Sequence, residues 1–108
     1  MPYLRVTVIT WKLDAASPDA EPLARRTRNE LRPLLRGLPG FRRFVAATTG
    51  PRTTVQVVEW ESEARATAAL PQIQAWLEGS GLTPQLDAID TYAGEVTDEI
   101  AGESPRAS

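Results

Sequence analysis

The chain has 108 residues, of which 42% are hydrophobic and 24% charged, and its net charge is −2 at neutral pH. A chain of this length forms one domain with a packed core, and this charge offers no general attraction to nucleic acids or anionic membranes. Cysteine and histidine are both absent, which excludes disulfides, thiol nucleophiles, Ser-His-Asp triads and the usual zinc and haem ligands.

The sequence also bears on where the protein resides. No run approaches the ~20 apolar residues of a membrane span, and the start MPYLR has no signal-peptide pattern. We therefore expect a soluble, cytoplasmic protein with no membrane or nucleic-acid partner.

The first expected element is a strand over residues 3–13, YLRVTVITWKL, which is rich in β-branched and aromatic residues. Strand side chains alternate between the two faces of a sheet. Apolar groups fall on both faces of this strand: Leu4 and Val8 point one way, while Ile9 and Trp11 point the other.

A helix is expected next, capped by Ser17, with Pro18 in its first turn, and running to about Arg36. Leucines recur along one face at helical spacing, so this face should pack on the core. Four arginines form a stripe on the other side, namely Arg25, Arg28, Arg32 and Arg36. We interpret the stripe as a solvated helix face rather than a phosphate-binding surface, since no aromatic side chains are interleaved with it.

Two strands follow, over residues 41–49 and 53–60, and the short link between them predicts an antiparallel hairpin. The second of these strands again carries apolar residues on both faces, with Val55 and Val57 on one and Val58 and Trp60 on the other.

The last third of the chain predicts a second helix and a final strand. Ser62 can cap the helix, Pro71 is expected to interrupt it, and Gly79-Ser80-Gly81 to end it. After a short turn, a strand is expected over residues 89–96.

The predicted fold class is α+β, a ferredoxin-like βαββαβ domain with a four-stranded antiparallel sheet, over residues 1–97. Residues 98–108 are polar and small, and we expect a flexible tail. Two helices can cover only one face of the sheet, yet both faces are apolar. A homodimer that stacks two sheets face to face is therefore expected, and the family resemblance described next implies that it is a dimeric α+β barrel.

The sequence resembles the antibiotic biosynthesis monooxygenase family in Leu38-Pro39-Gly40-Phe41, in the short hairpin, and in Val58-Glu59-Trp60-Glu61-Ser62. The oxygenases of this family carry a tryptophan on the third strand and an asparagine four residues earlier, both facing a pocket. Trp60 matches the tryptophan, and Gln56 stands in place of the asparagine with its amide kept. The resemblance implies that both are catalytic.

This resemblance implies a cofactor-independent monooxygenase that uses dioxygen to oxidise an aromatic polyketide-type molecule, such as an anthrone, to a quinone. It implies no metal, flavin or haem; the haem-degrading branch uses a histidine, and this chain has none. Two alternatives remain open: a non-catalytic small-molecule-binding or accessory dimer, and a polyketide cyclase of the same fold.

Four further side chains are candidate substrate contacts: Trp11, Arg43, Trp76 and Tyr92. The aromatic ones could form walls for a flat ring, although packing explains each of them as well. Adjacent strand residues face opposite ways, so either Arg42 or Arg43 is expected to point towards a buried layer, where it could balance a phenolate.

Overall fold

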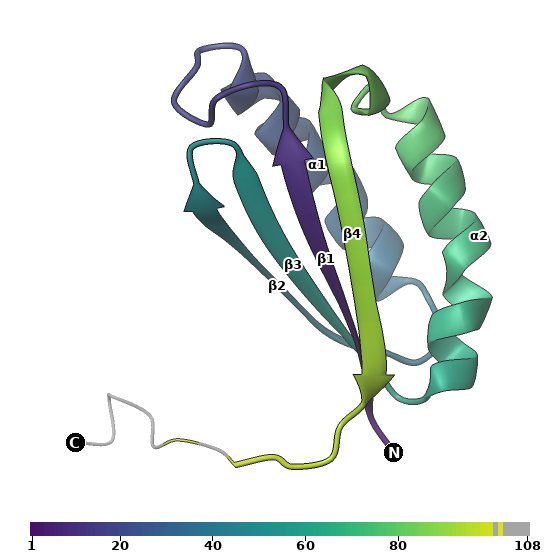
Figure 1. Ribbon diagram of the computed structural model, residues 1–108. Coiled ribbons are helices and arrows are strands. Elements are labelled where there is room, and N and C mark those ends of the chain that lie inside the picture. Colours follow the sequence, from purple (N-terminus) through teal and green to yellow (C-terminus); the bar gives the residue numbers. More distant parts are fainter. Residues whose placement is uncertain (101, 103–108) are drawn as a thin grey trace.

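The computed structural model describes residues 1–100 and 102 and confirms the predicted element order and fold class. Two helices pack beside a four-stranded sheet whose strand order is β2-β3-β1-β4 (Figure 1). The elements are β1 (Tyr3–Trp11), α1 (Ala20–Arg36), β2 (Phe41–Gly50), β3 (Thr53–Trp60), α2 (Glu63–Gly79), a 3₁₀ turn (Thr83–Gln85) and β4 (Leu86–Glu95). No helix within this described part is long and apolar enough to cross a membrane. Of the expected tail, residue 101 and residues 103–108 lie outside the described residues.

All neighbouring strands in the sheet are antiparallel, and their register fixes which side chains share a face. Tyr3 lies opposite Trp60, and Thr7 lies opposite Gln56 across the β1–β3 pair. Because directly paired residues point to the same side, Trp60 and Gln56 belong to one face. Val6 and its partner Val57 belong to the other.

Both helices cover the face that carries Trp60. The core there is formed by Leu31, Leu35, Leu38, Trp60, Ala66 and Ala69. Leucines of α1 and alanines of α2 therefore pack in one cluster with Trp60. The small alanines let α2 approach the sheet closely.

The start of α1 differs from the prediction. The helix begins at Ala20, and its cap residue Asp19 makes no side-chain cap bond. Ser17 instead forms a separate turn, in which its hydroxyl accepts from the Asp19 N–H (3.3 Å) and its carbonyl accepts from the Ala20 N–H (3.0 Å). Such local side-chain bonds compete with helix formation, so the helix starts two residues later than expected.

Helix α2 begins as predicted but is not interrupted by Pro71. The Ser62 hydroxyl accepts from the Arg65 N–H at 3.3 Å, which confirms it as the cap. The helix continues through Pro71 to Gly79, and Pro33 lies in the same way inside α1. Both prolines are exposed, so the missing N–H falls on the solvent side, where water can satisfy the unpaired carbonyl.

The second face of the sheet is apolar and is covered by neither helix. Leu4, Val6 and Val8 of β1 lie beside Val55 and Val57 of β3 on this face, and all five are only half-buried. Towards the sheet edges, Val45 is 42% exposed and Tyr92 is 63% exposed. A continuous apolar surface of this kind is unusual on a monomer.

Gly40, in the turn before β2, offers a test of this architecture. Its φ is +81°, and a Cβ there would lie 2.5 Å from the Arg65 Cγ. We expect Gly40→Ala to lower the free energy of unfolding by about 1–2 kcal/mol, measured by urea denaturation. Gly79→Ala is the matched control, because an added Cβ there has no atom within 4 Å. Equal effects of the two substitutions would contradict the described turn.

Candidate functional site

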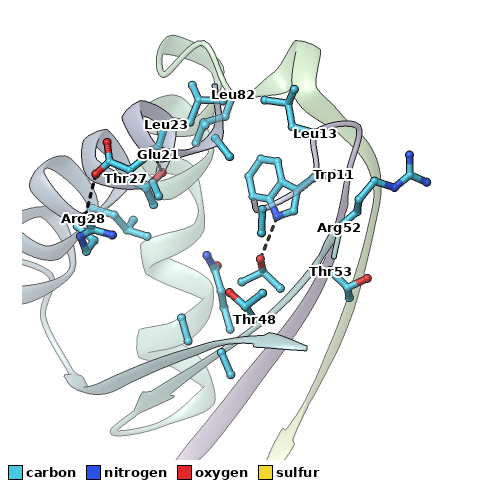
Figure 2. Close-up of a pocket in the computed structure, with 18 of the residues that line it drawn as sticks. Trp11, Leu13, Glu21, Leu23, Thr27, Arg28, Thr48, Arg52, Thr53 and Leu82 are labelled. Carbon is cyan, nitrogen blue, oxygen red and sulfur yellow. Dashed lines mark hydrogen bonds and ion pairs between the residues drawn. The ribbon is translucent and has the colours of Figure 1, made fainter. Parts of the chain in front are cut away.

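A cavity of about 580 Å³ lies between α1 and the helix-covered face of the sheet. It is lined by the end of β1, by β2, by the start of β3, by α1 as far as Arg32 and by Leu82 (Figure 2). Trp60 stands at the opposite end of β3. The layer between helices and sheet is therefore filled at one end and hollow at the other.

Trp11 projects into this cavity from the end of β1 (Figure 2). Its indole Nε1–H donates to the Thr54 hydroxyl oxygen at 3.0 Å. This bond joins neighbouring strands and fixes the ring plane, so the half-buried indole offers a pre-oriented aromatic surface.

Gln56 lies two residues after Thr54 on the same strand face and also lines the cavity. Within the described part of the chain its amide makes no hydrogen bond, and the amide is not among the buried unpaired groups. A half-buried amide that is open to the cavity can both donate to and accept from a bound molecule.

Charged groups of α1 form one rim of the cavity. Glu21 binds Arg25 at 2.7 Å and lies 4.0 Å from Arg28. Arg32, one turn further on, forms no ion pair with any described residue. Arg52, across the cavity, points away from it (Figure 2). Arg32 is thus the unpaired cation at this rim.

A smaller hollow of about 250 Å³ adjoins the cavity at Phe44 and Arg32, and it also contacts Arg42 and Arg43. The expectation that Arg42 or Arg43 points into a buried layer is wrong, since both are exposed. The β2 register shifts between Phe41 and Arg43, and Arg43 lies opposite Glu59, whose β1 partner Leu4 belongs to the uncovered face. Arg42 pairs with Glu59 at 3.1 Å.

Trp60 lies in the core and does not line the cavity. It is 1% exposed, and its ring meets Phe41 edge to face at 5.9 Å between centroids. Its Nε1–H is buried and has no partner among the described residues. The catalytic role that the resemblance implies for Trp60 stays a prediction.

Trp76 and Tyr92 also lie away from the cavity. The Trp76 Nε1–H donates to Glu30 at 3.1 Å, which ties α2 to α1. The Arg26 hydrogen bond to Glu30, helped by that of Trp76, holds the pKa of this carboxyl below its ordinary value. Tyr92 belongs to the uncovered face. Of the predicted contacts, the structure brings together Trp11 and Gln56 in the cavity and places Arg43 beside it.

The structure adds two residues that the sequence reasoning did not single out, Thr54 and Arg32. Strand alternation alone could have indicated Thr54, since it shares a face with Gln56. No sequence signal separated Arg32 from the other arginines of its stripe. Within residues 1–100 and 102, no three acidic side chains gather into a metal site.

Comparison with known proteins shows which solved structures have a similar fold. No protein-family model and no curated protein matches the sequence. Among solved structures, the chain is similar to the monooxygenase ActVA-Orf6 of Streptomyces coelicolor in complex with nanaomycin D, with 17% identity, a TM-score of 0.72 and coverage of 94% of this chain and 92% of that one. It is also similar to SnoaB, a cofactor-independent oxygenase from Streptomyces nogalater, with 16% identity, a TM-score of 0.69 and coverage of 94% and 98%.

A third similar structure is NE2512 of Nitrosomonas europaea, a protein of unknown function, with 19% identity, a TM-score of 0.69 and coverage of 95% and 96%. The chain therefore has the fold of the antibiotic biosynthesis monooxygenases, and the resemblance seen in the sequence is confirmed at this level. The fold is shared by enzymes and by a protein without an assigned activity, so the reaction must be argued from the site.

The core position of Trp60 leads to a stability prediction. We expect Trp60→Phe to lower the free energy of unfolding by about 1–2 kcal/mol, because the smaller ring underfills the contact with the leucines of α1. Trp11→Phe, at the half-open cavity wall, should cost less than half as much. Urea denaturation followed by circular dichroism measures both, and a larger loss for Trp11→Phe would contradict the assignment of Trp60 to the core.

Proposed function

We propose that this protein is a cofactor-independent monooxygenase that holds a flat aromatic molecule in the cavity beside Trp11 and Gln56. One observation carries the proposal: the apolar hollow contains a fixed indole and an amide that has no hydrogen-bond partner among the described residues. Such a pairing suits a planar ring that bears an oxygen substituent. The fold shared with ActVA-Orf6 and SnoaB supports oxidation as the reaction.

The proposed reaction converts the CH₂ group of an anthrone into a carbonyl. Deprotonation of this carbon gives a carbanion, which reduces dioxygen. One oxygen atom ends in the new C=O bond, and the other leaves as water together with the two hydrogens of the CH₂ group. The substrate thus supplies all the electrons that the balance requires, and dioxygen is the only co-reactant.

The residues of the cavity would assist this chemistry by binding and orientation. Trp11 would stack on the ring, and the Gln56 amide would donate to the substrate oxygen on which negative charge develops. Apolar wall residues such as Leu23 and Leu82 would exclude water. The unpaired Arg32 at the rim would favour the ionised form of the substrate.

One observation favours a second candidate, a binding module without turnover. Glu21 is the carboxylate among the described residues that line the cavity, and it is already engaged by the Arg25 guanidinium at 2.7 Å. If no protein group removes the proton, the same cavity would store or carry an aromatic molecule.

The test of the enzyme proposal uses 1,8-dihydroxyanthrone with oxygen uptake and quinone absorbance as readouts. We expect protein-dependent turnover that survives chelation of metals. Gln56→Leu should lower the rate by ten-fold or more while the fold is retained, since one donor to a developing charge is worth more than about 1.4 kcal/mol in a dry site.

Gln74→Leu is the matched control, because Gln74 is exposed on α2 and does not line the cavity. It should leave the rate unchanged. Anthrones also react with oxygen unaided, so the protein-free rate is subtracted. Binding of the anthrone without any acceleration would replace the enzyme proposal with the binding module.

We further propose that two copies pack through the uncovered face of the sheet. The valines of β1 and β3 on this face are the argument, since a partner sheet would remove them from water. A homodimer of this kind would form a dimeric α+β barrel, and a stable one buries more than about 1,200 Å² in total.

Light scattering at micromolar concentration tests the dimer. We expect a mass of twice 11.8 kDa for the native protein. Val57→Glu, at the centre of the uncovered face, should give monomers, whereas Thr67→Glu on the exposed side of α2 should not. A native protein that is monomeric at these concentrations would overturn the proposed assembly.

A further inference from the structure

The bond between Trp11 and Thr54 determines where the hydroxyl hydrogen of Thr54 can point. The indole N–H has no lone pair to accept a bond, so in this pair the threonine oxygen can only accept. Its own hydrogen must therefore turn away from the indole. No described residue accepts a hydrogen bond from this hydroxyl, whereas Thr27, on the facing helix, donates to the Leu23 carbonyl at 2.9 Å.

Thr54 and Gln56 present their polar groups to the same cavity. Both belong to the helix-covered face of β3, where they are half-buried, and their Cα atoms are about 7 Å apart, as is usual for residues i and i+2 of a strand. The strand thus presents one hydroxyl and one amide side by side next to the Trp11 ring, and neither donates to a described residue.

We propose that Thr54 is a specificity-determining residue that donates a hydrogen bond to a second oxygen of the bound molecule. This inference rests on the proposed function and narrows its substrate class. The ligand is a flat polycyclic ring that carries at least two oxygen substituents along one edge. Gln56 binds one of these oxygens and Thr54 binds the other, while the ring lies against Trp11.

A structural explanation of Thr54 makes a different prediction. If its hydroxyl serves only to orient Trp11, its removal affects every flat ligand alike, since all of them contact the indole. If it contacts the ligand, its removal affects only ligands with an oxygen at that place. Two probes separate these cases: 1,8-dihydroxyanthraquinone, with three oxygens along one edge, and unsubstituted anthraquinone, with a single oxygen on that edge.

The experiment compares Thr54→Val with Thr54→Ser by calorimetric titration of both probes. Thr54→Val keeps the shape of the side chain and removes the hydroxyl. We expect it to lower the affinity for 1,8-dihydroxyanthraquinone about three- to ten-fold. The affinity of this variant for anthraquinone should stay within about two-fold of the native value. Thr54→Ser should retain the native affinity, and Thr67→Val on exposed α2 is the control.

A second pair of variants tests whether Thr54→Val changes ligand affinity only by changing the position of the Trp11 indole. In a Trp11→Phe background, the selective loss caused by Thr54→Val should persist. If Thr54→Val lowers the affinity for both probes equally, or if the selective loss of affinity disappears in the Trp11→Phe background, Thr54 only orients Trp11 and the inference is overturned. If anthraquinone binds and Thr54→Val has no selective effect, the inference fails while the proposed function stands. If neither probe binds the native protein, both fail.

Discussion

The burial of Trp60 is the contact on which the rest of the molecule depends. Its ring fills the space between the sheet, the leucines of α1 and the alanines of α2, and it closes one end of the layer between helices and sheet. Because the ring is large and the packing around it is close, the helices are fixed at this end. At the other end Trp11 lies at the cavity wall and is only half-buried, and the space between α1 and the sheet is not filled there.

The sequence resemblance implies a catalytic role for both Trp60 and Gln56, but the two side chains lie in different surroundings. Trp60 stabilises the fold, while Gln56, two residues before Val58 on the same face, reaches the hollow. The aromatic surface in the cavity comes instead from Trp11 on the neighbouring strand. Its orientation is set by a single hydrogen bond to Thr54, so a small polar residue of β3 controls the shape of the site.

The sequence predicted the fold well and the site only in part. Alternation and turn residues located every strand and both helices, because these signals are local. The two incorrect predictions also have local causes: the Ser17 turn moves the start of α1 to Ala20, and the exposed Pro71 does not break α2. The site depends on how far apart α1 and the sheet stand at each end, which no local pattern contains. The resemblance indicated Gln56, and Trp11 was one of several candidate aromatic contacts; both line the cavity, whereas Trp76, another candidate, does not.

We propose that the hollow end of the helix–sheet layer binds a flat aromatic ligand between Trp11 and Gln56. A crystal structure of the protein with bound 1,8-dihydroxyanthraquinone tests this most directly. We expect the ring to lie in the cavity, parallel to the Trp11 indole and with one oxygen within hydrogen-bond distance of the Gln56 amide. A ring bound on the uncovered valine face, or in the smaller hollow beside Phe44, would contradict it.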